Sequence, residues 1–143
     1  MILHQLSHLN WVAVVVATFT AFLIGSVWFT PQVALRRWAA ALASYTGKTI
    51  DELLRPPTRV SIVQWLVGMF LGSIVVGLLV HAGAADSPGS GAVLGLVLWA
   101  GIGATFSSWP PIFGGQPWRL WAVNNSAYLL MLVAGGTILG AWR

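Results

Sequence analysis

The charged side chains of this chain are confined almost entirely to one stretch. Seven of the ten charged residues lie between Arg36 and Arg59, and the sequence on either side of that stretch is overwhelmingly apolar. Only 7% of all residues are charged and 57% are hydrophobic, whereas about 25% of residues are charged in soluble domains. This distribution predicts an integral membrane protein.

Four apolar segments are each long enough to cross the hydrocarbon core of a bilayer, which requires about 20 helical residues. None shows the polar alternation of a barrel strand, and an open strand edge would leave backbone groups unpaired in lipid. We therefore expect an all-α membrane protein with a single transmembrane domain over residues 1–143 and four helices arranged as two hairpins. The expected helices span approximately residues 9–29, 60–80, 91–109 and 120–142.

The basic residues predict the orientation of these helices. Lys and Arg occur in the first and third connections, but not in the tail before Leu9 or in residues 81–90. Because an excess of Lys and Arg marks the cytoplasmic side, both termini should lie outside, with Arg143 as the single exception. The first helix lacks a preceding basic segment and should remain as an uncleaved anchor. The low Lys content favours a bacterial protein, so we expect a multi-pass protein of the bacterial inner (cytoplasmic) membrane.

The first connection, residues 30–59, should form a structured layer on the cytoplasmic face. Apolar residues recur there at helical spacing, and Gly47 follows where a helix would end. Thr49 and Glu52 have the spacing of a capping box before the break at Pro56. Its short amphipathic helices either lie in the headgroup region or pack on the protein's own spans. The helical stripe consists of Leu35, Trp38, Leu42 and Tyr45, and the residues that should face headgroups are Arg36, Arg37, Lys48, Arg55, Arg59 and Arg119.

Small residues recur at four-residue spacing in every predicted span. Such residues let helices approach closely in lipid, where association depends on packing and not on the burial of apolar surface from water. Packing within the bundle would use most of them, but their number also fits a homo-oligomer or a larger assembly. The predicted helix-packing residues are Ala13, Ala17, Ala21, Gly25, Gly68, Gly72, Gly91, Gly95, Gly136 and Gly140, and the third span adds Ala100 with Ala104.

No ionisable side chain lies within the predicted spans, which argues against a proton-coupled transporter, a voltage sensor or a carboxylate-based intramembrane enzyme. Uncharged polar groups could instead form interhelical hydrogen bonds or a small polar site beneath the cytoplasmic face. No cofactor is predicted, but a bound lipid, pigment or quinone could lie near the two mid-span tryptophans, Trp65 and Trp99, if these are not simply packed. The candidates for the polar site are Gln64, Ser107, Asn124 and Asn125.

The partners that the sequence favours are lipids and membrane helices. Its few basic residues serve one membrane face and do not indicate nucleic acid. The Gly47–Thr49 run lacks the preceding strand and glycine of a phosphate-binding loop, so we expect no nucleotide. There is no cysteine, and the candidates for metal ligands on the outer side are His4, His8, His81 and Asp86; interfacial histidines without metal are the alternative.

Four runs of sequence resemble a known family. Residues 10–14 open the first helix with Asn-Trp-Val-Ala-Val, and residues 25–31 close it with Gly-Ser-Val-Trp-Phe-Thr-Pro. Together with residues 113–128 and 140–142, they are similar to the bacterial membrane family catalogued as domain of unknown function 1761. Phe29 departs from the tyrosine expected there. The resemblance implies a small multi-spanning membrane protein and supplies no activity or catalytic residue.

These observations favour a non-catalytic polytopic membrane protein that acts through helix packing, either as a homo-oligomer or as an accessory subunit of a larger membrane complex. The alternative is a small-solute or lipid transporter or channel, with a polar site at the cytoplasmic helix ends. We expect no enzyme, because the chain offers no nucleophile with a base and no carboxylate pair at depth.

Overall fold

The computed structural model describes the backbone of residues 2–142 and the side chains of residues 5–142. Every regular element in this part of the chain is helical, and the prediction of an all-α membrane protein is confirmed. The elements in chain order are α1 (Ile2–Ser7), α2 (Trp11–Trp28), α3 (Leu35–Thr46), α4 (Ile50–Leu53), α5 (Arg59–Leu79), η1 (Val80–Ala84), α6 (Pro88–Leu98), η2 (Trp99–Ala104), α7 (Thr105–Ser107), α8 (Trp109–Phe113) and α9 (Trp118–Ala141).

Four helical stretches are long and apolar enough to span a membrane. Their bounds are Trp11–Trp28, Arg59–Ala84, Pro88–Phe113 and Trp118–Ala141. The third is longer at both ends than residues 91–109, because Ser87 caps its start and Pro110 and Pro111 lie in the first turn of α8. Proline is tolerated in a first turn, where its missing N–H removes no helical hydrogen bond.

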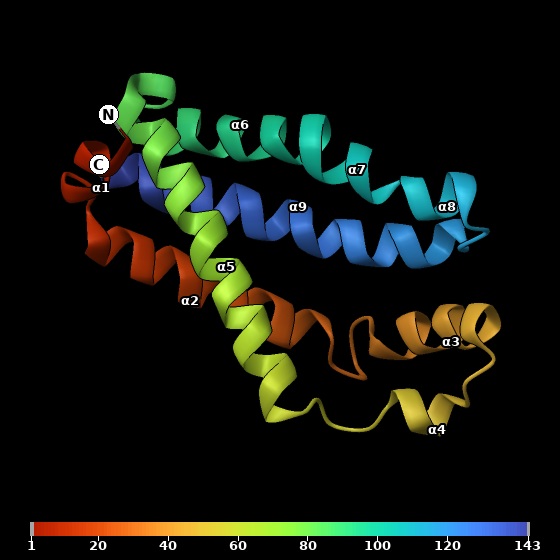
Figure 1. Ribbon diagram of the computed structural model, residues 1–143. Helices are drawn as coiled ribbons and strands as arrows, with labels where there is room; N and C mark the ends of the chain where they lie inside the picture. The colour runs from red at the N-terminus through yellow and green to blue at the C-terminus, as the bar shows by residue number, and fades with distance from the viewer. Residues whose placement is uncertain (1, 143) are drawn as a thin grey trace.

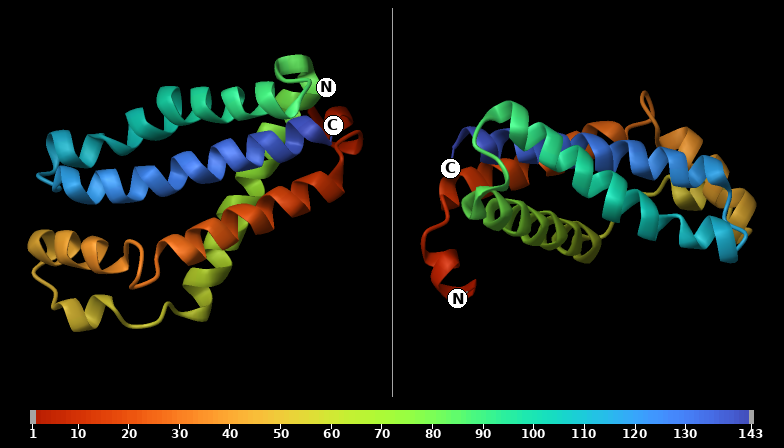
Figure 2. Two further views of the ribbon diagram at one scale, coloured as in Figure 1. Left: turned by 180° about the vertical axis from the view of Figure 1, so that it is seen from behind. Right: turned by 90° about the horizontal axis from the view of Figure 1, so that it is seen from above.

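The two ends of the molecule differ in character. Both chain termini lie at one end, and α3, α4 and α8 lie at the other (Figures 1 and 2). We call the second end the basic end, because it carries the basic residues of the first connection and Arg119 at the start of α9. The even number of spans places the N- and C-termini on the same side of the bundle.

Helix α9 is the centre of the fold. It lies between α2 and α6 along most of its length (Figure 1) and also contacts α5 and α3. The main core cluster joins Ala13, Val14 and Ala17 of α2 to Val76 and Leu139 of α5 and α9. The side chains of Ala13, Val14 and Ala17 are completely buried, so one face of α2 is fully covered.

The closest helix pair is α6 with α9, which run side by side (Figure 2). A Cβ atom added to Gly91 would collide with the carbonyl oxygen of Gly136, and one added to Gly95 would collide with that of Leu132. A Cβ added to Gly140 would collide with the carbonyl oxygen of Ser87. The backbones touch here because all four glycines lack side chains, as expected for small-residue packing in lipid.

The other hairpin packs differently. Helix α5 crosses α2 obliquely and diverges from α9 toward the basic end (Figure 2). Near the end of the bundle that holds the chain termini, Val76 of α5 and Val80 of η1 lie in the core. The chain then reverses direction at Gly83, whose φ of 90° is readily adopted by glycine. The divergence separates the first half of α5 from α9 and creates the cleft described below.

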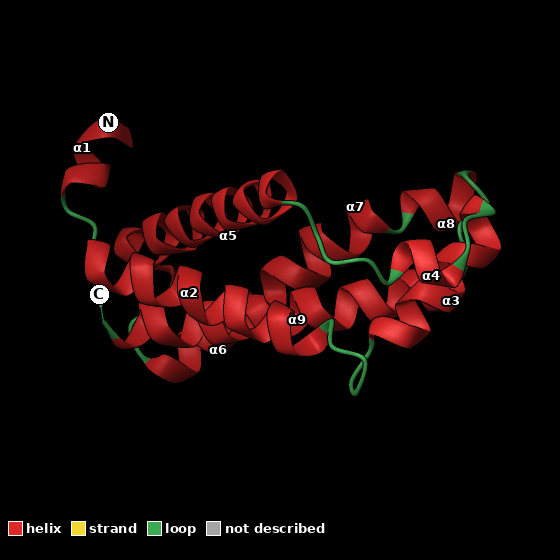
Figure 3. Cartoon of the chain, turned by 90° about the horizontal axis from the view of Figure 1, so that it is seen from below, coloured by secondary structure: helices red, strands yellow, loops and turns green. Residues whose placement is uncertain are grey.

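The first connection forms the expected layer at the basic end (Figure 3). Helix α3 ends at Gly47 in the left-handed conformation, and Thr49 and Glu52 form a capping box at the start of α4. Helix α3 packs against α9, with Ala39 and Ala41 buried. Packing on the protein's own span therefore occurs, although Tyr45 of the predicted stripe is 45% exposed.

Candidate functional site

A network of hydrogen bonds joins the basic half of α9 to the third span. The hydroxyl of Ser107 lies 3.0 Å from the side-chain oxygen of Asn125 and 2.6 Å from the carbonyl oxygen of Gly103, and it accepts a bond from the indole N–H of Trp121 at 3.2 Å. The amide of Asn125 donates to the carbonyl oxygen of Trp121 at 3.1 Å. The indole of Trp99 donates to the Asn125 carbonyl oxygen at 3.0 Å. Each of these polar side chains therefore has a hydrogen-bond partner within the network.

Two of the four predicted polar-site residues belong to this network and two do not. Ser107 and Asn125 lie together, and Asn125 is only 2% exposed. Gln64 is exposed on α5 and makes no hydrogen bond to the described residues, because the oblique course of α5 turns that face outward. Asn124 is half-buried and also lacks a hydrogen bond in this part of the chain. The predicted site therefore does not form as a group of four.

Indole donors were the part of this network that sequence reasoning missed. Neither Trp28 nor Trp121 is among the predicted polar-site residues, yet the indole of Trp121 joins this network and that of Trp28 donates to the carbonyl oxygen of Val123 at 3.1 Å. Tryptophans within a turn of a span end therefore serve as interhelical donors here. By contrast, Trp11, Trp109, Trp118 and Trp142 are 42–55% exposed, as expected for interfacial anchors.

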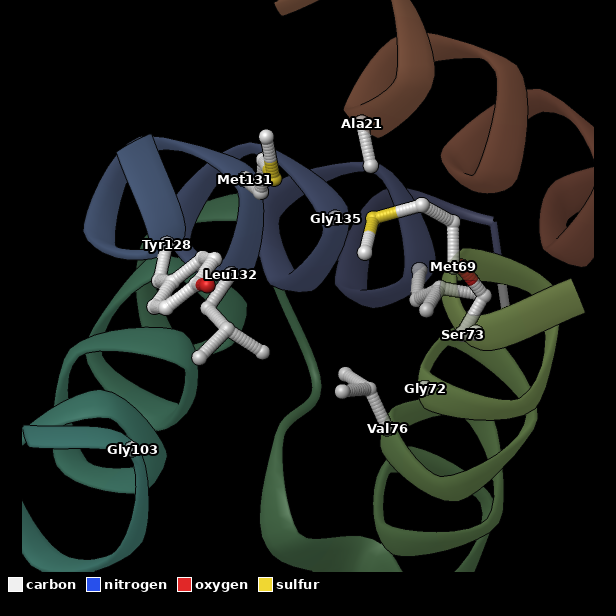
Figure 4. A pocket seen from close by; sticks show the side chains of 12 residues that line it. Ala21, Met69, Gly72, Ser73, Val76, Gly103, Tyr128, Met131, Leu132 and Gly135 are labelled. Carbon is white, nitrogen blue, oxygen red and sulfur yellow. The ribbon is translucent and has the colours of Figure 1, made fainter. Parts of the chain in front are cut away.

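A cleft of about 220 Å³ lies where α5 diverges from α9, and we call it the α5–α9 cleft (Figure 4). Helix α9 and η2 form one wall, α5 forms the opposite wall, and Ala21 of α2 contributes to it as well. The lining is apolar except for two hydroxyl groups. The residues lining the cleft are Ala21, Gly68, Met69, Gly72, Ser73, Val76, Gly103, Tyr128, Met131, Leu132, Gly135 and Leu139.

The hydroxyls that line the cleft belong to Ser73 of α5 and Tyr128 of α9. Ser73 is 7% exposed, and neither hydroxyl has a hydrogen-bond partner among the described residues. Two other hydroxyls in the spans bond to the helix backbone. Buried Thr18 donates to the carbonyl oxygen of Val14 at 2.8 Å, and half-buried Thr137 donates to that of Val133 at 2.7 Å. Ser73 is thus available to a group inside the cleft.

The predicted helix-packing residues divide into three sets. Ala13, Ala17, Ala21 and Gly25 lie on the buried face of α2, and a Cβ at Gly25 would collide with Trp65 and Met131. The four glycines of α6 and α9 form the close helix pair. Gly68 and Gly72 differ, because a Cβ at either position would meet nothing within 4 Å. Within this chain, they line the cleft and contact no other helix closely.

The two mid-span tryptophans lie beside the cleft, but neither lines it. Trp65 packs against Gly25 and lies 5.0 Å from the ring of Phe22 between centroids. Trp99 lies behind Gly103, where a Cβ would come within 3.7 Å of the indole. Both indoles therefore support the walls of the cleft from outside.

The six basic residues predicted to face headgroups are all exposed. They lie on α3, in the loops on either side of α4 and in the first turns of α5 and α9. In the same layer, the Thr49 amide and hydroxyl, and then the charge of Lys48, hold the pKa of Glu52 below its usual value. The six residues are Arg36, Arg37, Lys48, Arg55, Arg59 and Arg119.

The predicted metal ligands form no cluster in the described side chains. The rings of His8 and His81 stack in parallel with centroids 6.2 Å apart. Asp86 instead accepts a hydrogen bond from the hydroxyl of Ser90 at 3.1 Å, beside the cap of α6. The side chain of His4, the fourth candidate, lies outside the described residues.

The fold and its interfaces define a small helical membrane protein of four spans centred on its last helix. Residues 12–140 match the model of a protein family described as a protein of unknown function, DUF1761, and the chain belongs to that family. The resemblance inferred from its sequence motifs is therefore confirmed. No curated protein and no solved structure matches the chain.

Proposed function

We propose that this protein is a non-catalytic membrane protein that acts through helix packing, as a homo-oligomer or as an accessory subunit of a larger membrane complex. The observation that carries the proposal is a surface of small residues on the third span that no other helix of the described chain covers. Ala100 and Gly101 are exposed there, and a Cβ added to Gly101 would meet nothing within 4 Å. Only 11% of the 18-residue apolar stretch of this span is buried within the chain.

Glycine at position 101 lowers the stability of the helix, and no contact within the described chain compensates for this loss. Glycine in a helix interior is less favourable than alanine by about 1 kcal/mol. At Gly91 and Gly95 the close approach of α9 accounts for the missing side chain, whereas nothing within the chain covers Gly101. A helix from a second copy or another subunit would gain close backbone contact at this surface.

The polar network supports packing in preference to a path for a solute. The side chains of Ser107 and Asn125 satisfy one another and nearby backbone groups. A solute passing this point would have to break these bonds. We therefore favour assembly over transport by a route through this cluster.

We also propose that the basic end faces the cytoplasm of a bacterial cell and that both termini lie outside. The support is that the six exposed basic residues lie on α3, in the loops beside α4 and at the starts of α5 and α9, elements that all lie away from the chain termini. Anionic lipid headgroups on the cytoplasmic face attract such residues. This end would then hold the largest water-facing surface of the protein.

Native mass measurement after extraction in a mild detergent tests the assembly proposal. The native protein should have the mass of an oligomer or of a complex with another subunit, and Gly101→Leu should shift it to the mass of a single chain. Gly72→Leu is the matched control, because Gly72 is equally uncovered but lies in the cleft. A single-chain mass for the native protein, or equal effects of both variants, would contradict the proposal.

A further inference from the structure

The proposed packing role does not explain the size and the polar groups of the α5–α9 cleft. We propose that it binds the uncharged ring of a quinone-type membrane molecule, a six-membered ring carrying two carbonyl oxygens, with its apolar tail extending into the lipid. The site is independent of the proposed assembly surface, since Gly101 does not line it.

Three glycines make the space for such a ring. A Cβ added to Gly68, Gly72 or Gly135 would meet nothing within 4 Å, and Gly135 is nevertheless buried. The cleft of about 220 Å³ is larger than an engineered apolar cavity of about 150 Å³ that binds benzene. It is smaller than the pocket of about 300 Å³ or more that a drug-sized ligand requires. A single substituted ring fits this range.

Two hydroxyls give the cleft its polar character. Ser73 is 7% exposed, and its hydroxyl has no partner among the described residues. No buried polar atom of the described side chains is unpaired, so this hydroxyl is open to the cleft and can donate to a ligand there. Tyr128 lies across the cleft from it, on the α9 side, and its hydroxyl is also unpartnered in the described part of the chain (Figure 4). Both groups can donate to a carbonyl oxygen. Donors on opposite walls suit a ring with an oxygen on each side.

The rest of the lining excludes a charged headgroup. None of the charged residues that the structure describes lines the cleft, so a phosphate or carboxylate would have no ionic partner among them. Met69 and Met131 present flexible thioethers, which adapt to and interact favourably with the edges of rings. Gly68, Gly72 and Tyr128 are exposed, which leaves the mouth open for an apolar tail.

Retention of ligand on gel filtration tests the proposal with the full-length purified protein. The probe is decylubiquinone, and decylbenzene supplies the same tail on a ring without oxygens. The native protein and Gly101→Leu should each retain about one decylubiquinone per chain and little decylbenzene. Gly135→Leu should fill the cleft and reduce retention at least tenfold.

Two conservative variants report on the hydroxyls without filling the space. Ser73→Ala and Tyr128→Phe should each weaken decylubiquinone binding about fivefold, the usual effect of one hydrogen bond. These variants keep the helix fold, so they remain informative if Gly135→Leu does not fold. They should leave the native mass unchanged, which separates failure of this proposal from failure of the assembly proposal.

Four results would overturn the quinone site. They are no retention by the native protein, equal retention of decylbenzene, unchanged retention by a folded Gly135→Leu protein, and displacement of decylubiquinone by phosphatidylglycerol at equal concentration. The second and fourth outcomes would indicate a site for a hydrocarbon chain or a phospholipid.

Discussion

The hydroxyl of Ser107 lies 3.0 Å from the side-chain oxygen of Asn125, and this contact links the third span to the fourth inside the apolar part of the bundle. The two residues are 18 positions apart and lie on helices that run in opposite directions. Because Asn125 is 2% exposed, its amide has no alternative partner in lipid or water. The contact therefore fixes the axial position of the third span against α9.

Replacing Asn125 with Ala should destabilise the fold by about 0.6 to 2 kcal/mol, the range found for hydrogen bonds between membrane helices. Its neighbour Asn124 is the control, because it is half-buried and makes no hydrogen bond within the described chain. Asn124→Ala should change stability by less than about 0.5 kcal/mol. Reversible unfolding in mixed detergent measures both, and equal losses would show that the network adds no stability.

Gly95→Ala should be much more damaging than Gly101→Ala, a substitution of equal size in the same span. The added methyl group would collide with the backbone of α9 at Leu132, and a crowded interface of this kind costs about 1 to 3 kcal/mol. Gly101→Ala meets no neighbour within the chain, so it should leave the stability of the single chain unchanged or raise it by up to about 1 kcal/mol. Thermal unfolding of the two variants gives the comparison. Similar melting temperatures would mean that α6 and α9 separate readily.

The proposed orientation predicts opposite labelling of the two ends of the bundle. The chain contains no cysteine, so a single introduced cysteine reports on one position only. In intact cells, an impermeant maleimide should label Asp86→Cys and not Thr46→Cys, while disrupted cells should label both. The reverse pattern would mean that the basic end faces outward.

The capping box should titrate at low pH. Because hydrogen bonds from Thr49 hold the pKa of Glu52 below 4.5, the stabilisation is present above the unfolded pKa and is lost as the pH falls through the folded value. The amide resonance of Thr49 in an NMR titration should therefore shift with a midpoint below 4.5. Thr49→Val removes the hydroxyl contact and should raise the Glu52 midpoint. A midpoint that does not move would mean that this contact is not formed in solution.

The spans, the glycine stop and the capping box could be predicted because each depends on nearby residues. Hydropathy over about 20 residues reports contact with lipid, whatever the neighbouring helices do. Gly47 and the pair Thr49 and Glu52 act within one helical turn, and the structure contains both features. Local patterns of this kind do not require knowledge of the fold.

The cleft and the polar network depend on how helices meet, which the sequence pattern does not specify. Gly68 with Gly72 has the same spacing as Gly91 with Gly95, yet the first pair lines open space and the second touches a backbone. The difference follows from the oblique course of α5. The same course turns Gln64 away from Asn125, so a residue at the predicted depth lies on the wrong face.

The position of α9 among the other spans also bears on how the protein is made. Helices α2, α5 and α6 each contact α9, and Asn10 at the start of α2 donates a hydrogen bond to the carbonyl oxygen of Trp142 at 2.9 Å. These partners enter the membrane before α9 has been synthesised. A nascent chain that stops before Trp118 therefore contains three spans without their common partner. Completion of the last helix is the step at which the inserted segments can become one packed unit, and interrupted synthesis would leave loosely associated spans exposed to membrane proteases.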